Sequence, residues 1–171
     1  MVCVIPPHEM PARVLLIGYG NVLRGDDALG PMAAERLRPL LTGALRISVE
    51  LMSCHQLSPE LAEPLSRCEL ALFVDAAACG EPGTVRVQRL WPQSGDTASL
   101  THHVQPAALL ALAQALYGRA PEAMLVTGSG ATFEGRESLS EPGRKALHEI
   151  CRLVPRLIQN FRAPDDSLAA E

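Results

Sequence analysis

The sequence predicts an α/β protein: a three-layer α/β/α single domain with a five-stranded mixed, largely parallel sheet. Three observations lead to this fold class. A chain of 171 residues is long enough for one domain with a full hydrophobic core. Hydrophobic residues make up 47% of it, which is ordinary for a globular protein. Strand-like and helix-like segments alternate in the order β-α-β-α-β-β-α-β-α, a pattern typical of helices packed on a central sheet.

Five segments have the character of strands. Residues 13–18, RVLLIG, form an apolar run of strand length, which is typical of a strand covered on both faces. Residues 84–90 alternate in polarity, so we expect this segment near an edge of the sheet. The other predicted strands are residues 45–52, 69–77 and 123–130.

Four segments have helical character. In residues 27–41, apolar side chains recur on one helical face. Residues 58–68 begin with the Ser-Pro pair favoured at helix starts, and residues 106–118 finish on a glycine, which is favoured just after a helix. The last helix is predicted at 140–161, where Pro155 is expected to kink or interrupt it.

We expect the domain to span residues 13–162, with loose termini at 1–12 and 163–171. The first residues lack the basic region of a signal peptide, and no apolar run is long enough to cross a bilayer. A soluble cytoplasmic protein without membrane insertion is therefore expected, with a monomer as the simplest oligomeric state. The net charge of -4 argues against a nucleic-acid partner. The five cysteines form no CxxC pair, so we expect reduced thiols rather than a zinc site.

The stretch LLIGYGNVLRGDDALG, residues 15–30, joins the first predicted strand to the first helix through a glycine-rich turn. A dinucleotide fingerprint, G-x-G-x-x-G, requires a third glycine where this chain has Leu23, and no G-x-x-x-x-G-K-(S/T) loop is present. The turn instead places Asp26 and Asp27 near the helix start. An acidic residue there also stabilises a helix by capping, so a structural and a functional role both stay open.

Two further segments put polar groups where ligands bind in open α/β sheets, at the carboxyl ends of strands. Asp75 ends an apolar strand, and His102 and His103 precede a helix. Together with Asp27, they offer two carboxylates and an imidazole, a set that suits a divalent first-row metal with open coordination positions. The weaker candidates are His8, His55 and His148.

The stretch GYGNVLRGDDALG resembles the G-x-G-N-x-L-x-x-D-(D/E)-x-x-G signature of the hydrogenase maturation proteases, the nickel-dependent endopeptidases of [NiFe]-hydrogenases. The likeness continues through HQLSPELAEPL, LFVDAA, PGTV, THHVQPAALLALAQALYG and LSEPGRKAL, and it covers roughly residues 13–160. The resemblance implies a five-stranded, three-layer α/β fold. It also implies removal of a short C-terminal extension from the hydrogenase large-subunit precursor after nickel insertion.

The resemblance further implies that the precursor's nickel is recognised through Asp27, Asp75 and a histidine of the THH segment. His102 matches the familiar form, because an apolar residue follows two positions later and Pro106 follows four positions later. A shorter spacing to the proline would select His103 instead. The nickel is then supplied by the substrate rather than held permanently, and the partner is the large-subunit precursor.

The sequence contains no G-x-S-x-G, no convincing cysteine nucleophile and no H-E-x-x-H. Metal-assisted hydrolysis is therefore our hypothesis, in which nickel positions the peptide, polarises its carbonyl group or activates water. Asp26 is a candidate general base, and Asn21 is a candidate to fix the substrate chain. Two alternatives are a non-catalytic chaperone that binds the immature large subunit and, less favoured, a nucleotide-binding enzyme that uses the first turn.

Overall fold

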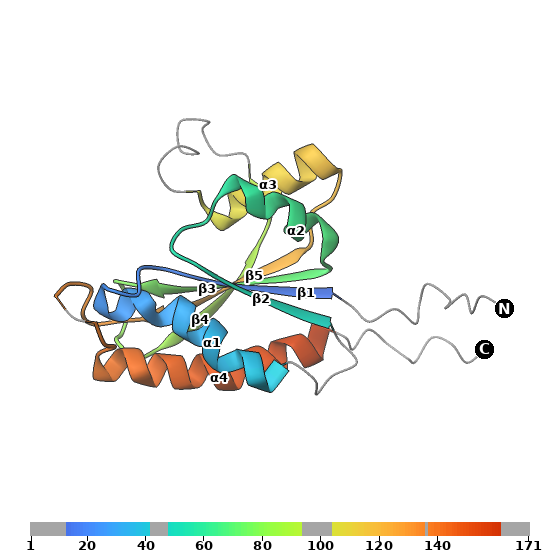
Figure 1. Cartoon of the computed structure of the whole chain (residues 1–171). Helices are drawn as coiled ribbons and strands as arrows, with labels where there is room; N and C mark the ends of the chain where they lie inside the picture. Colours follow the sequence, from blue (N-terminus) through green and yellow to red (C-terminus); the bar gives the residue numbers. More distant parts are fainter. Residues whose placement is uncertain (1–12, 42–47, 94–103, 136, 162–171) are drawn as a thin grey trace, which may run out of the picture.

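A five-stranded sheet with the order β2-β1-β3-β5-β4 forms the centre of the computed structural model (Figure 1). The structure describes residues 13–161 apart from 42–47, 94–103 and 136, so both termini predicted to be loose lie outside it. The strands are β1 (Arg13–Tyr19), β2 (Ser48–Cys54), β3 (Leu70–Ala77), β4 (Val85–Leu90) and β5 (Glu122–Ser129). β4 runs antiparallel to β5, and the other pairs are parallel. The predicted mixed, largely parallel sheet is confirmed, with the alternating segment at one edge.

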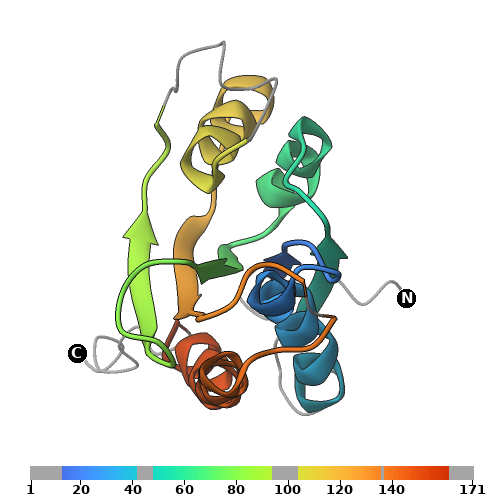
Figure 2. The ribbon, with the colours of Figure 1, turned by 90° about the vertical axis from the view of Figure 1, so that its left-hand side faces the viewer.

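Helices cover both faces of this sheet. The elements are α1 (Leu29–Leu41), α2 (Ala62–Arg67), α3 (Pro106–Tyr117) and α4 (Glu141–Phe161), with short 3-10 turns η1 (Gly25–Ala28) and η2 (Pro59–Leu61). α1 and α4 lie on one face, and α2 and α3 lie on the other (Figures 1 and 2). The predicted three-layer α/β/α architecture is therefore confirmed.

The core is divided into two layers by the central strands. In β1, Leu16 packs in the cluster that contains α1 and α4, whereas Leu15 and Ile17 pack in the cluster that contains α2 and α3. All three side chains are almost completely buried. Because both faces of β1 are covered, its sequence is a continuous apolar run instead of an alternating one.

The order of the strands creates a topological switch point. The chain passes from β1 through α1 to β2 on one side, and then through α2 to β3 on the other side of β1. Ligands of open α/β sheets bind outside the carboxyl ends of the strands at such a point. The carboxyl ends of β1 and β3 are therefore the expected place for a site.

Two glycines allow the first helix to lie directly on these strand ends. A side chain on Gly18 would collide with the carbonyl oxygen of Gly30. A side chain on Gly30 would collide with the carbonyl oxygens of Tyr19 and Val74, which belong to β1 and β3. The start of α1 is consequently fixed against the carboxyl end of the sheet.

Several observed elements differ from the predicted ones: α2 begins at Ala62 after the 3-10 turn η2, and β2 extends to Cys54, two residues beyond its predicted end. The helix predicted at 27–41 is preceded by the 3-10 turn η1, so Asp26 and Asp27 lie in this turn and not in α1. The interruption expected at Pro155 is wrong, because α4 is continuous from Glu141 to Phe161. Buried side chains on both sides of Pro155, Val154 and Ile158 among them, pack against the core and offset the hydrogen bond that proline cannot donate.

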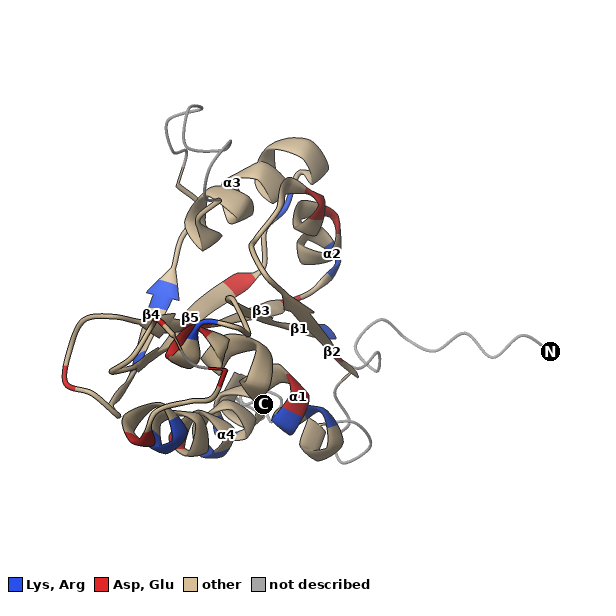
Figure 3. Cartoon of the chain, turned by 60° about the vertical axis from the view of Figure 1, so that its left-hand side comes forward, with Lys and Arg blue, Asp and Glu red and all other residues tan. Residues whose placement is uncertain are grey.

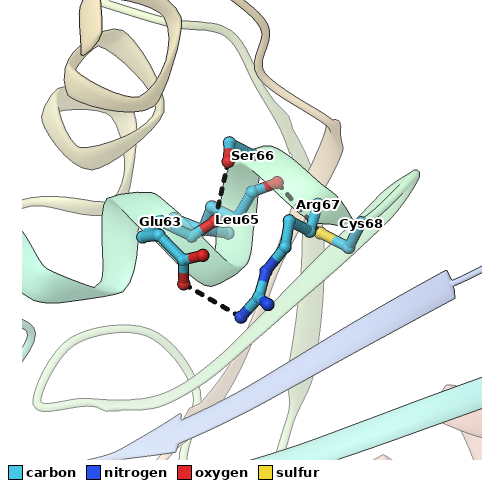
Figure 4. A network of polar contacts seen from close by, with 5 residues as sticks. All are labelled: Glu63, Leu65, Ser66, Arg67 and Cys68. Carbon is cyan, nitrogen blue, oxygen red and sulfur yellow. Dashed lines mark hydrogen bonds and ion pairs between the residues drawn. The ribbon is translucent and has the colours of Figure 1, made fainter. Parts of the chain in front are cut away.

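The end of α2 shows how the chain leaves a helix to begin β3 (Figure 4). The Ser66 hydroxyl donates to the Glu63 carbonyl oxygen at 2.7 Å, and Arg67 forms an ion pair with the Glu63 carboxylate at 2.9 Å. The Cys68 thiol donates to the Leu65 carbonyl oxygen at 3.3 Å. These bonds satisfy carbonyl groups of the last helical turn, which have no partner within a helix.

The charged residues of the described chain are mixed in sign. Acidic and basic side chains are interspersed along α4, for example Glu141, Arg144 and Glu149 (Figure 3). Among the described residues, no helix combines the length and the apolar character that crossing a lipid bilayer requires.

Candidate active site

A cleft with a volume of about 340 Å³ lies at the carboxyl ends of β1, β2 and β3. It occupies the switch point between β1 and β3, as expected for an open α/β sheet. Its lining residues are Tyr19, Gly20, Asn21, Arg24, Asp27, His55, Gln56, Leu57, Asp75, Ala76, Val104 and Gln105. The two acids that the sequence assigns to metal recognition, Asp27 and Asp75, therefore line one cleft.

The glycine-rich turn after β1 holds Asp27 at this cleft. Gly20 has a φ of 140°, and a side chain there would collide with the Asp27 carbonyl oxygen. The backbone N–H of Asn21 donates to Asp27 Oδ2 at 2.9 Å. A phosphate-binding turn would offer such an N–H group to its ligand, but here the chain's own carboxylate occupies it. The Asn21 N–H group therefore binds a carboxylate of the chain itself, which further disfavours a nucleotide phosphate at this turn.

Asn21 organises the turn through its side chain as well. Its Oδ1 atom accepts a hydrogen bond from the backbone N–H of Leu23 at 2.9 Å, and its carbonyl oxygen accepts one from Arg24 at 3.1 Å. The first of these is the local side-chain bond that makes asparagine common in turns. The side-chain oxygen of Asn21 is thus engaged within the turn.

Asp75 lies half-buried in β3 with two hydrogen-bond donors. The backbone N–H of Ala76 donates to Asp75 Oδ1 at 2.8 Å, and the Tyr19 phenol donates to the same carboxylate group. Burial raises the pKa of Asp75, and the nearby charge of Asp27 adds to this rise, while the two hydrogen bonds act in the opposite direction. Burial and the charge of Asp75 likewise raise the pKa of Tyr19. Asp27 and Asp75 are therefore electrostatically coupled within the cleft.

Asp26, in contrast, is fully buried and is not among the residues that line the cleft. Its carboxylate accepts four hydrogen bonds, from the N–H groups of Ala131 (2.7 Å), Thr132 (3.0 Å) and Ser140 (2.7 Å) and from the Ser140 hydroxyl (2.6 Å). Burial alone raises the pKa of Asp26, but these hydrogen bonds lower it below the ordinary value. A carboxylate placed in this way joins η1 to the start of α4, which disagrees with the general-base role considered from the sequence.

The predicted histidines have different positions. His102, His103 and His8 lie outside the described residues. His55 is exposed and lines the cleft, whereas His148 is exposed on α4. Close to the THH segment in the sequence, Val104 and Gln105 line the cleft.

Within the described ranges, no group of three or more His, Cys, Asp and Glu side chains is arranged to hold a metal ion. These ranges supply two carboxylates at one cleft, Asp27 and Asp75, with His55 also on its lining. Carboxylate oxygens and imidazole nitrogens are suitable ligands for divalent first-row metals. A third ligand from this chain or from a bound molecule would complete a recognition site at this position.

Tyr19 and Arg24 are among the cleft residues that the sequence did not single out. Tyr19 ends β1, so its position beside the end of β3 follows from the pairing of the two strands. Arg24 is an exposed cation of the turn that lines the cleft. Both residues lie inside the glycine-rich stretch after the first strand, and this place in the sequence is the signal that indicates them.

Comparison with known proteins places this geometry in context. No protein-family model and no curated protein sequence matches the chain. Solved structures do match. The [NiFe] hydrogenase maturation protease HycI from Thermococcus kodakarensis is 24% identical with a TM-score of 0.68, and the match covers 87% of this chain and 94% of that one. The hydrogenase maturating endopeptidase HybD from E. coli is 21% identical with a TM-score of 0.66, covering 88% and 94%.

A third match has slightly higher sequence identity. The hydrogenase 2 maturation peptidase from a Thaumarchaeota archaeon is 26% identical with a TM-score of 0.64, covering 86% of this chain and 98% of that one. All three matches extend over almost the whole of each structure. The chain therefore has the fold of the [NiFe] hydrogenase maturation proteases, and these neighbours support the family that its sequence motifs indicate.

Proposed function

We propose that this chain is an endopeptidase that removes the C-terminal extension of a [NiFe]-hydrogenase large-subunit precursor after nickel insertion. The observation that carries the proposal is the position of Asp27 and Asp75, which come from separate elements and line one cleft at the switch point of the sheet. The fold shared with maturation proteases and the match to their first motif support the same activity.

The same proposal assigns recognition of the precursor's nickel to Asp27, Asp75 and a histidine, His102 or His103. Two carboxylates and an imidazole suit a divalent first-row metal. The negative charge of Asp27 disfavours ionisation of Asp75, and a divalent cation between them offsets this repulsion. The THH segment precedes Val104, which lines the cleft, and this supports a histidine as the third ligand. The nickel belongs to the substrate, and the precursor's own ligands complete its coordination.

Cleavage adds water across one peptide bond and yields a new carboxylate and a new amine. Asp27 and Asp75 are the carboxylates of the described chain that line the cleft, so they are the groups available to bind metal or accept a proton there. Asp26 is buried and fully hydrogen-bonded, so we do not assign proton transfer to it.

The test is cleavage of a purified large-subunit precursor, with and without nickel, followed by intact-mass measurement. We expect shortening of the nickel-loaded form only. Asp27→Asn and Asp75→Asn should each reduce the rate by about 100-fold or more, because losing only an outer partner of a metal ligand already costs about 10- to 100-fold in affinity or activity. His102→Ala and His103→Ala, compared side by side, identify the third ligand. His148→Ala, an exposed substitution on α4, serves as the matched control and should keep the full rate.

Each other outcome has a definite meaning. Equal cleavage of loaded and nickel-free precursor would reject nickel recognition while leaving the peptidase activity. A precursor that binds but keeps its original mass would reject the peptidase activity in favour of the chaperone alternative.

A further inference from the structure

We infer that Val22 and Leu23, in the turn between β1 and η1, form a docking surface for apolar side chains of the precursor next to its metal. This inference rests on the proposed function, because it takes the cleft beside the turn as the place where the precursor binds. It goes further by assigning substrate binding to two residues that neither coordinate metal nor take part in hydrolysis.

The first observation is exposure beside the cleft. Val22 is 54% exposed and Leu23 is 65% exposed. The residues that flank this pair in the chain, Asn21 and Arg24, both line the cleft. Two adjacent aliphatic side chains are thus presented to solvent at the rim of the candidate active site.

The second observation is that the turn is held in place by hydrogen bonds. Leu23 and Arg24 donate their backbone N–H groups to Asn21, and Asn21 donates to Asp27. These bonds use only backbone atoms of the aliphatic pair, so the turn itself needs neither the Val22 nor the Leu23 side chain. A surface that is already ordered loses little conformational entropy when a partner binds.

The chemistry of the pair specifies its partner. Exposed turn positions commonly hold Gly, Asn, Asp or Ser, which satisfy local backbone groups, whereas Val22 and Leu23 offer only aliphatic surface. Exposed apolar neighbours also occur away from the cleft, at Leu116 and Tyr117, so it is the place of Val22 and Leu23 between two cleft-lining residues that suits them to burial by a bound precursor. A precursor segment whose metal lies at Asp27 and Asp75 would pass over this rim, and apolar side chains there would cover the pair.

The chain provides a closely matched control. Leu116 is 64% exposed, nearly the same fraction as Leu23, but it lies in the last turn of α3. The residue before α3, Gln105, lines the cleft, so Leu116 is at the opposite end of that helix. Leu116→Gln therefore removes the same amount of exposed apolar surface away from the cleft.

The experiment measures kcat and KM for cleavage of nickel-loaded precursor by the full chain carrying Leu23→Gln, Val22→Gln or Leu116→Gln. In parallel, titration calorimetry measures binding of the intact precursor. We expect Leu23→Gln to raise KM about tenfold, equivalent to about 1.4 kcal/mol, with kcat within about twofold of the parent. Val22→Gln should act in the same direction, and Leu116→Gln should match the parent. Thermal unfolding should be nearly unchanged in all three variants, because the replaced side chains are exposed.

The outcomes separate this inference from the proposed function. If the parent cleaves the precursor and Leu23→Gln leaves KM unchanged, or changes it no more than Leu116→Gln, the docking surface is rejected and the peptidase stands. A fall in kcat at constant KM would also reject it, since the turn would then act only on Asp27. If the parent binds the precursor without cleaving it and Leu23→Gln weakens this binding, the docking surface is supported and the peptidase activity is rejected. If the parent neither cleaves nor binds, both are rejected.

Discussion

The phenol of Tyr19 is a hydrogen-bond donor fixed against Asp75 within the cleft. A donor of this kind orients a carboxylate ligand without touching the metal itself. We predict that Tyr19→Phe lowers the cleavage rate of nickel-loaded precursor by about tenfold, because outer partners of metal ligands typically contribute 10- to 100-fold. The ring that packs in the core is retained, so the thermal midpoint should shift by only a few degrees.

Tyr19→Leu is the comparison that separates positioning from packing. It removes the hydroxyl and the ring together, so both the cleavage rate and the thermal midpoint should fall. A cleavage rate for Tyr19→Phe equal to that of the parent would show that the phenol does not position Asp75.

Among single residues, the two acids that line the cleft could be identified from the sequence, whereas the roles of the residues beside them could not. Asp75 was predictable because it ends a strongly apolar strand, and Asp27 because it lies in a glycine-rich turn after another strand. Tyr19 and Asp26 were not, since their roles depend on partners far away in the sequence. Asp26 bonds to residues 131, 132 and 140, and nothing local to the GDDA segment distinguishes its buried carboxylate from that of Asp27.

Between helical elements, the 3-10 turn η1 is joined to the start of α4 mainly through hydrogen bonds of the Asp26 side chain. Its carboxylate accepts from the backbone N–H and the hydroxyl of Ser140, directly before α4, and its own N–H donates to Thr132 at 2.8 Å. We predict that Asp26→Asn destabilises the fold by about 2–4 kcal/mol, because an amide nitrogen replaces one acceptor and leaves buried donors unpaired. Denaturant unfolding monitored by circular dichroism measures this loss.

Asp27→Asn is the control for this change, because Asp27 is the next residue in the chain. Its side chain is only half-buried, and in the cleft turn it accepts a hydrogen bond from the Asn21 N–H group. It should cost less than about 1.5 kcal/mol. Equal losses for the two variants would contradict the assignment of Asp26 as the residue that joins these elements.

The bounds of the helices and strands show which features hydrophobic periodicity predicts and which it does not. The bounds of β3, β4, β5 and α3 lie within one residue of the predicted segments, because apolar runs, alternation and a terminal glycine are local signals. The predicted helices took in Asp27 and Ala28 of η1 and all of η2, since helix-start signals such as the Ser58-Pro59 pair do not distinguish a 3-10 turn from the first turn of an α-helix. Pro155 was predicted to disturb α4, but tertiary packing of the residues around it prevails over this local preference.

For the whole molecule, the alternation of segments predicted the layers but not the strand order. The order β2-β1-β3-β5-β4 depends on which faces the crossover helices cover, and this is decided by packing among residues distant in the sequence. It is this order that brings the end of β3 beside the end of β1, and so brings Asp75 to Asp27. The sequence grouped the two acids because both follow predicted strands and because of the family resemblance, whereas the pairing of β1 with β3 shows why they line the same cleft.

The integrity of the two-sided core can be tested through its thiols. Cys68 is buried between α2 and β3, and burial raises its pKa to about 12, whereas Cys79 is exposed. The thiolate is the reactive form and the reagent must reach it, so the exposed Cys79 should be alkylated readily while Cys68 stays almost unreactive. Cys68 should react only when the core opens, at least about a thousandfold more slowly than Cys79 if opening requires the 5 kcal/mol or more typical of unfolding.

Iodoacetamide labelling followed by peptide mass measurement checks this prediction, and labelling in denaturant provides the control. In denaturant the two cysteines should react at similar rates, since Cys68 is then no longer buried. Because the α2–α3 layer also borders the cleft through Leu57, rapid labelling of Cys68 in the native protein would mean that this layer opens independently of the rest. The two-layer core would then not unfold as one unit, and the rigid placement of Asp75 against Asp27 would lose its structural basis.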